Sequence, residues 1–255
     1  MKVSIIGCGA IGSEVAKAAS QTEGVDEVIL FDVDPDATAQ LKGLPRTRVA
    51  RTAKEAVDGC DLLIEAANKG VVQTCVRDAL AAGKKTMLMT IGALADDALR
   101  EELVGLARKT GGKMYLPSGA VMGVDGVKAA AVGDLKSVTL VTTKPPQGLE
   151  KKTDRWTLLF SGSAREAVQR FPKNVNVAAT LSLAGLGFDQ THVQVAIDPL
   201  AQRNSHKVII EGSFGRARIE VENLPSPTNP ATSYLASLSA IALLRRIVSP
   251  VEIGA

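Results

Sequence analysis

A short apolar run that passes directly into a glycine cluster constrains the fold of this chain more than any other feature. Residues 3–6 read VSII and residues 7–12 read GCGAIG. From residue 11 to residue 19, apolar residues recur at the spacing of one face of a helix. The sequence therefore predicts a strand, a tight glycine turn and a helix in immediate succession.

The glycine spacing is typical of a turn that binds the phosphates of a dinucleotide. Gly7 permits the tight turn, Gly9 removes the side chain where a pyrophosphate comes close, and Gly12 lets the helix approach the strand. The free N–H groups at the start of the helix, at Ala10 and Ile11, would bind the phosphates. A glycine turn of purely structural use is the alternative, and the flanking strand and helix favour the nucleotide.

An acidic residue ends the next apolar run, residues 28–31, about 20 residues past the last glycine of the turn. At this position the carboxylate of Asp32 would accept hydrogen bonds from the ribose hydroxyls of the adenosine and would repel a 2′-phosphate. Val33 and Asp34 follow and bring no positive charge to receive such a phosphate. We therefore expect NAD as the cofactor, with NADP as the alternative.

Further apolar runs alternate with helical patterns through the first half of the chain. Such alternation implies βαβ units and a parallel, doubly wound sheet. We predict an α/β protein whose residues 1–116 form a Rossmann dinucleotide-binding domain. After the first two strands, a capping box at 52–55 is expected to start a short helix. The further strands and helices expected are, in chain order, 62–64, 71–82, 86–89, 96–110 and 114–116.

The rhythm changes after Pro117, where strand patterns follow one another directly. Strand next to strand implies antiparallel pairing, so residues 117–230 are predicted to form a second α+β domain, for substrate binding and dimerisation, on a largely antiparallel or mixed sheet. A final helix over residues 231–255 is expected to pack back on the first domain. The strands expected in the second domain are 138–143, 191–197, 206–211 and 219–221.

Composition and charge exclude several classes of function. The 255 residues carry a formal net charge of +3 and only 3% aromatic residues, too little for a nucleic-acid-binding footprint. No apolar run approaches the ~20 residues that cross a bilayer, and no signal-peptide pattern is present, so we expect a cytoplasmic protein without a membrane partner. The three cysteines are widely spaced and predict neither a disulfide framework nor a metal site.

Six further segments resemble the L-aspartate dehydrogenase family. They stand in the family's order and cover nearly the whole chain, which makes them far more specific than the glycine turn alone. The segments are IGALAD at 91–96, PSGAVMGVDG at 117–126, KPP at 144–146, FPKNVNVAA at 171–179, DP at 198–199 with NSH at 204–206, and NLPSPTNP at 223–230.

The resemblance implies NAD(P)-dependent oxidative deamination of L-aspartate, through iminosuccinate, to oxaloacetate and ammonia, together with the reverse amination. It also implies a homodimer that pairs through the sheet of the second domain. By the same resemblance the catalytic histidine is His206, and Ala120 and Asn176 contact the cofactor.

The residues themselves give a separate argument for His206. Histidine is the one unperturbed side chain that changes charge near neutral pH, and the chain has only two. Alternation along 191–197 places His192 on a solvated face, whereas His206 shares its strand face with Val208 and Ile210. A histidine that merely caps the sheet is the alternative.

A dicarboxylate substrate needs cations and hydrogen-bond donors, because its carboxylates lose water when they enter a cleft. We expect the substrate near Ser118, Lys173, Asn174 and Asn204, but the sequence does not rank these residues above the other candidates. The other candidate cations and donors are Lys128, Lys144, Arg203, Thr232 and Ser233.

Two other functions stay open at this point. One is a dehydrogenase or reductase of the same architecture, of the homoserine dehydrogenase or dihydrodipicolinate reductase type, with a different substrate. The other is a non-catalytic NAD-binding sensor whose second domain serves only dimerisation. An activity assay would separate the three functions. Oxidation of L-aspartate supports the first, oxidation of a different substrate the second, and no turnover the NAD-binding sensor.

Overall fold

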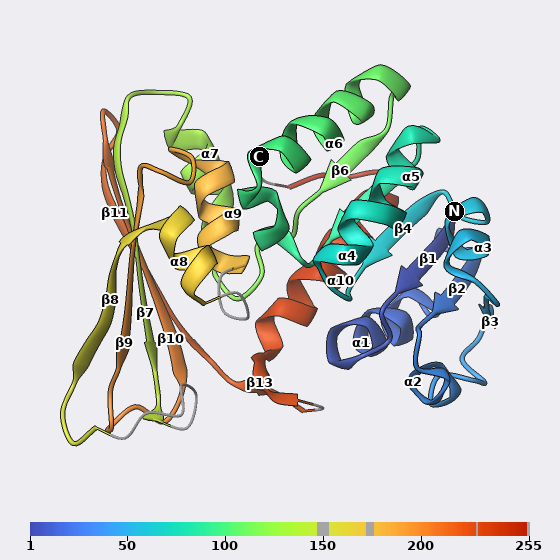
Figure 1. Cartoon of the computed structure of the whole chain (residues 1–255), viewed down its shortest axis with the longest axis horizontal. Coiled ribbons are helices and arrows are strands. Elements are labelled where there is room, and N and C mark those ends of the chain that lie inside the picture. Colours follow the sequence, from blue (N-terminus) through green and yellow to red (C-terminus); the bar gives the residue numbers. More distant parts are fainter. Residues whose placement is uncertain (147–152, 172–175, 228, 254–255) are drawn as a thin grey trace. The chain divides into compact units, whose positions relative to one another are not determined.

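The computed structural model describes residues 1–146, 153–171, 176–227 and 229–253 (Figure 1). The chain divides into two compact units. Unit 1 consists of residues 1–117 with 237–252, and unit 2 consists of residues 118–236 with 253–255. No helix among the described residues is both long enough and apolar enough to cross a membrane.

Unit 1 is built on a six-stranded parallel sheet in the order β3-β2-β1-β4-β5-β6. This is the order of a Rossmann dinucleotide-binding fold, so the predicted fold class is confirmed. Strand β3 was not predicted from the sequence, because its three residues are too few for a recognisable period. The strands are β1 (Lys2–Ile6), β2 (Glu27–Phe31), β3 (Thr47–Val49), β4 (Leu62–Glu65), β5 (Lys85–Leu88) and β6 (Lys113–Tyr115).

The helices of unit 1 begin and end at recognisable residues. Thr52 accepts a hydrogen bond from the Glu55 amide (3.1 Å) and so caps α3, and Gly111 ends α6 in the left-handed conformation. The single helix expected over 71–82 is interrupted by a π-helical segment. The helical elements are α1 (Ala10–Ala19), α2 (Pro35–Ala39), α3 (Ala53–Asp58), α4 (Lys69–Val71), the π-helix η1 (Val72–Val76), α5 (Arg77–Ala81), the 3₁₀ helix η2 (Ile91–Ala95) and α6 (Asp97–Thr110).

The last helix, α10 (Tyr234–Val248), packs into the core of unit 1 through Ala240, Leu243 and Leu244. The predicted bounds 231–255 were too wide. Residues 231–233 complete strand β13 (Asn229–Ser233), and the helix stops before Pro250, which disfavours helix in the residue before it. Leu238 of the same helix is 40% exposed and does not belong to the buried stripe.

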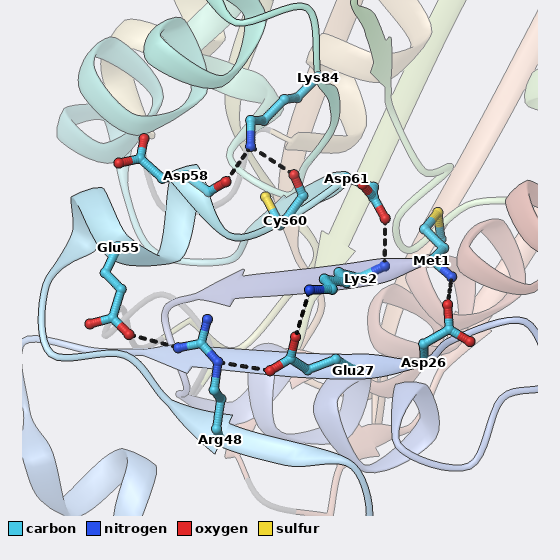
Figure 2. Close-up of polar contacts among 10 residues, drawn as sticks. All are labelled: Met1, Lys2, Asp26, Glu27, Arg48, Glu55, Asp58, Cys60, Asp61 and Lys84. Atoms are coloured by element: carbon cyan, nitrogen blue, oxygen red, sulfur yellow. Dashed lines mark hydrogen bonds and ion pairs between the residues drawn. The ribbon is translucent and has the colours of Figure 1, made fainter.

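Polar contacts join the amino ends of the strands of unit 1 (Figure 2). Arg48 of β3 pairs with Glu27 of β2 (2.8 Å) and with Glu55 of α3 (2.7 Å), and Lys84 donates to the Cys60 carbonyl oxygen (2.8 Å). These ion pairs are partly exposed and add little stability. They tie down the edge of the sheet opposite to the carboxyl ends, where an open α/β sheet binds its ligands.

Unit 2 contains a five-stranded sheet in the order β11-β10-β7-β9-β8. The neighbours β7 and β9 are parallel and the other pairs are antiparallel, which agrees with the predicted mixed sheet. Helices α7, α8 and α9 cover one face (Figure 1). The elements are α7 (Val124–Ala130), β7 (Leu135–Lys144), β8 (Thr157–Ser163), α8 (Ala164–Arg170), α9 (Asn176–Ala184), β9 (Thr191–Ile197), β10 (Asn204–Gly212) and β11 (Gly215–Asn223), followed by a small ladder of β12 (Pro225–Ser226) with β13.

The alternation of side chains along β10 sets the two faces of this sheet. His206, Val208 and Ile210 are buried toward the helices, while Lys207 and Ile209 lie on the opposite, outer face. A tight turn between Gly212 and Gly215 returns the chain into β11. The hairpin therefore carries residues 204, 206, 221 and 223 on the helix-covered face at one end of the sheet.

Candidate active site

The glycine turn of unit 1 depends on the missing side chains. Gly7 has φ = 95°, and a Cβ atom there would lie 2.5 Å from the Ala66 carbonyl oxygen. A Cβ at Gly12 would lie 1.8 Å from the Gly7 carbonyl oxygen. A Cβ at Gly9, by contrast, would meet nothing within 4 Å. Gly7 and Gly12 are therefore needed for packing, and Gly9 leaves open space.

That open space lies at the start of α1. Gly9 is the N-cap, and no side chain caps the helix, so the first N–H groups, among them those of Ala10 and Ile11, are available to an external acceptor. The turn also follows β1 at the point where the strand order reverses between β1 and β4. This topological switch point is where doubly wound sheets bind nucleotides, and the geometry fits a pyrophosphate.

The structure brings Asp32 to the glycine turn. Its carboxylate accepts hydrogen bonds from the Cys8 amide (2.6 Å) and from the Asp34 amide (2.9 Å), which fix it just after β2. Burial, together with the charge of Asp32, raises the pKa of the Cys8 thiol to about 12. Cys8 is therefore protonated at neutral pH and fills space in the turn.

Glu65 is a buried carboxyl group that the sequence analysis missed. It accepts hydrogen bonds from the Thr90 amide (2.9 Å), the Thr90 hydroxyl (2.6 Å) and the Ala67 amide (2.8 Å). Burial raises its pKa. These contacts join the carboxyl ends of β4 and β5 and hold the backbone next to Ala66, against which Gly7 packs. No local pattern marks such a residue, because Thr90, which donates two of these hydrogen bonds, lies 25 positions away.

In unit 2, His206 is 6% exposed, and its Nδ1 lies 3.0 Å from the Thr142 hydroxyl. Burial and the nearby charge of Lys144 lower the pKa of His206 to about 4. The imidazole is therefore neutral at pH 7. Contact through Nδ1 leaves Nε2 as the ring nitrogen for other partners.

Lys144 is the candidate cation that the structure places beside His206. It lies two residues after Thr142 on the same strand face and is 7% exposed, and burial lowers its pKa. Lys128 and Arg203 are exposed instead, and Arg203 lies 4.0 Å from Glu222. Lys173 lies outside the described residues.

The remaining predicted residues differ in how deeply they are buried. Asn204 begins β10 two residues before His206, and its Oδ1 is buried without a hydrogen-bond partner in the described part of the chain. Ala120 is 7% exposed, and its carbonyl oxygen accepts a hydrogen bond from Asn223 (3.0 Å). Ser118 is half-buried in the same loop, whereas Asn176 is exposed at the first residue of α9. Asn174 lies outside the described residues.

His192 lies on the outer face of the unit 2 sheet, as the alternation predicted. Its Nε2 is 3.1 Å from the Ser161 hydroxyl. The pairing of Thr139 with His192 and of Thr142 with Val195 shows that the two histidines occupy opposite faces. His192 is therefore not part of the cluster around His206.

The fold and the glycine turn define the class of this protein. A model described as the NAD-binding domain of homoserine dehydrogenase matches residues 7–117, which is the Rossmann part of unit 1. The chain is therefore an NAD(P)-binding oxidoreductase of two units. This match covers the cofactor-binding half and carries no information on the substrate.

The comparisons for the second half and for the whole chain identify the family. The model of the C-terminal part of aspartate dehydrogenase matches residues 125–247. L-aspartate dehydrogenases of Methanosarcina acetivorans and Methanosarcina barkeri are 45% and 44% identical, over 100% of this chain and 99% of their own. The crystal structure of aspartate dehydrogenase from Thermotoga maritima has a TM-score of 0.84 and 26% identity, covering 100% and 99% of the two chains. This chain belongs to the L-aspartate dehydrogenase family.

Two of the three glycines of the turn, Gly9 and Gly12, give matched variants with opposite expected effects. Gly9→Ala should keep the free energy of unfolding, since its Cβ meets open space, and should weaken NADH binding by about tenfold or more by filling the pyrophosphate position. In Gly12→Ala, the free energy of unfolding should fall by about 3 kcal/mol or more, because the new Cβ overlaps the Gly7 carbonyl oxygen. Urea unfolding and NADH fluorescence titration measure both quantities. Unchanged NADH affinity in Gly9→Ala would contradict this assignment.

The lowered pKa of His206 predicts a pH dependence of stability. Between pH 6.5 and about 4 the unfolded chain binds a proton at this residue and the folded chain does not, so stability falls as the pH falls through this window and is retained above it. The loss should reach about 3 kcal/mol. In His206→Gln, the free energy of unfolding should fall by about 3 kcal/mol less over the same pH range than in the unmodified protein. Urea unfolding at several pH values across the window measures both. Parallel curves for the two proteins would show that the burial of His206 is not the cause.

Proposed function

We propose that this chain oxidises L-aspartate with NAD to iminosuccinate, which is hydrolysed to oxaloacetate and ammonia, and that it also catalyses the reverse amination. The observation that carries the proposal is the buried cluster in unit 2, where a neutral imidazole, an ammonium group and amide oxygens share one end of a sheet. Membership of the L-aspartate dehydrogenase family supports the choice of substrate.

We assign the pyrophosphate of NAD to the glycine turn, at Gly7, Gly9 and Gly12 with the amides of Ala10 and Ile11, where the open space at Gly9 supports the fit. When bound, NAD accepts a hydride from the substrate.

The ribose hydroxyls are assigned to Asp32. Asp34, which caps α2, and Asp36 add negative charge next to it, and this charge disfavours the 2′-phosphate of NADP. Ala120 and Asn176 are proposed to contact the cofactor from unit 2, as the family resemblance implies.

We assign a substrate carboxylate to Lys144. Burial lowers the pKa of Lys144, and an incoming carboxylate would stabilise the charged form of its ammonium group. Ser118 and Asn204 are proposed as further substrate contacts, because Ser118 shares a loop with Ala120 and Asn204 flanks His206. Lys173 and Asn174 remain proposed substrate contacts on the sequence alone.

His206 is proposed as the general acid and base. Its neutral Nε2 can accept the proton that the substrate ammonium must lose before hydride leaves Cα. Loss of hydride forms the C=N bond of iminosuccinate. His206 then releases the proton it accepted to solvent. Water adds to the iminium carbon, and His206 takes a proton from the added water and passes it to the nitrogen. The remaining hydroxyl loses its proton as the C–N bond breaks, which gives oxaloacetate and ammonium. Thr142 orients the ring through Nδ1.

The alternative readings have less support. A homoserine dehydrogenase type rests on residues 7–117 alone, while the substrate half matches the aspartate dehydrogenase model. A non-catalytic sensor would have no use for a buried imidazole beside a buried ammonium, an arrangement that destabilises the charged state of both groups.

We further propose a homodimer through the outer face of the unit 2 sheet. This face carries Val141, Ile209 and Leu158 among paired charges such as Lys207 with Glu220 (3.2 Å). Helices α7, α8 and α9 lie on the other face (Figure 1). The apolar side chains of the outer face would otherwise meet water, and a second copy of the chain would bury them. A cytoplasmic location is proposed with it, and three buried free thiols suit that reducing compartment.

The activity is tested by absorbance at the NADH band with L-aspartate and NAD, and with oxaloacetate, ammonium and NADH in reverse. His206→Ala should lower turnover by about 10² to 10⁴-fold and leave NADH binding nearly intact. The matched control, His192→Ala, should be nearly silent because it lies outside the cluster. Absence of aspartate turnover in the unmodified protein would refute the function, and normal turnover in His206→Ala would refute only the role of His206.

The proposed dimer predicts twice the chain mass of 26.6 kDa by light scattering at micromolar concentration. Ile209→Arg places a charge in the middle of the outer face and should shift the protein toward monomer. Val132→Arg is the control, since Val132 is 91% exposed and lies outside the sheet. A monomeric unmodified protein would rule out the dimer.

A further inference from the structure

Asn223 ends β11 at the same end of the unit 2 sheet as His206. It is 4% exposed and pairs directly with Asn204 in the antiparallel register, while Val221 pairs with His206. Directly opposed residues of antiparallel strands have neighbouring side chains on one face. The two asparagines are therefore cross-strand neighbours beside the imidazole.

The hydrogen bond of Asn223 fixes which end of its amide is free. Nδ2 donates to the Ala120 carbonyl oxygen at 3.0 Å, and the opposite orientation of the amide would place two acceptors against each other. Oδ1 is thereby left as an acceptor. Within the described residues, neither this atom nor Oδ1 of Asn204 has a hydrogen-bond partner, although both are buried.

Two buried amide oxygens without donors destabilise the free protein and select a ligand that supplies donors. The carboxylates of a dicarboxylic amino acid are acceptors only, and its amino group is its strong donor. We propose that Oδ1 of Asn223 and Oδ1 of Asn204 together bind the amino group of the substrate. The proposal rests on the function proposed above and adds the specificity for an amino group to it.

The position of the two oxygens suits the chemistry as well as the binding. Departure of hydride from Cα turns the amine into a positively charged iminium, and amide oxygens stabilise that charge as it develops. His206 lies two residues from Asn204 on the same strand face, within reach of a nitrogen held by the asparagines. Lys144 is a cation and would repel the amino group, so it remains with a carboxylate.

Asn223 also connects the substrate to the loop that contains Ser118 and Ala120. Its Nδ2 holds the Ala120 carbonyl, and a Cβ at Gly123, at the end of the same loop, would lie 2.2 Å from Ile219 of β11. The loop is thus packed against the strand that Asn223 ends. An amino group on Oδ1 would therefore bind to an amide whose orientation this loop already fixes.

The reverse reaction separates the amino group from the carbon skeleton, because ammonium and oxaloacetate are added independently. In Asn223→Ala the KM for ammonium should rise about tenfold or more, with a matching rise in the KM for L-aspartate in the forward direction. The KM for oxaloacetate and the dissociation constant of NADH should change less than about threefold. A merely structural role in the loop would raise all of these together.

Asn204→Ala is the second variant and should show the same selective rise, so the test stands even if Asn223→Ala does not fold. Gln169→Ala is the control, since it removes an amide of the same chemistry from the exposed surface of α8. Equal rises for oxaloacetate and ammonium, or an unchanged KM for ammonium in either variant, would overturn the proposal. Absence of turnover in the unmodified protein would instead refute the proposed function.

Discussion

The close approach of backbone to backbone in the glycine turn is the contact on which unit 1 depends. Because a Cβ at Gly12 would overlap the Gly7 carbonyl oxygen, α1 can start directly above β1 only without side chains there. That placement leaves the helix start open and brings the Cys8 amide within 2.6 Å of the Asp32 carboxylate. One steric constraint thus sets both the open helix start and the position of Asp32, to which the pyrophosphate and the ribose of NAD are proposed to bind.

Unit 2 has the opposite character, since its defining feature is buried polarity rather than close packing. His206, Thr142 and Lys144 lie at the polar end of a face whose middle is apolar, with Val138, Leu140, Val208 and Ile210. Burying an imidazole, an ammonium and two unpartnered amide oxygens reduces stability. Such groups persist where a ligand uses them, which is why the polar end of this face, and not its apolar middle, carries the proposed chemistry.

Local patterns in the sequence predicted five of the six strands of unit 1 and the glycine turn, and placed Asp32 at the end of the second strand, because each depends on neighbours within a strand, a turn or a helix. The alternation around residue 206 likewise placed His206 on the buried face and His192 on the outer one. Thr142 and Asn223 were missed, since their importance depends on the register of β7 with β10 and of β10 with β11. Thr142 and His206 are 64 positions apart, and no local periodicity of the sequence shows that two such strands pair. The bounds of α10 were missed for a related reason, because pairing with Pro225 and Ser226, and not local propensity, makes 229–233 a strand.

The charge of Lys144 influences the protonation state of His206. The ammonium of Lys144 is a source of positive potential, and together with burial it keeps His206 neutral, so the imidazole can receive a proton and not only deliver one. A carboxylate that pairs with Lys144 would reduce that potential and raise the proton affinity of His206 when the substrate is in place. The same carboxylate would therefore prepare His206 to accept the proton of the substrate ammonium. In the proposed mechanism, Lys144 would thus couple binding to proton transfer, and the amide oxygens of Asn204 on β10 and Asn223 on β11 would hold the nitrogen that the proton leaves.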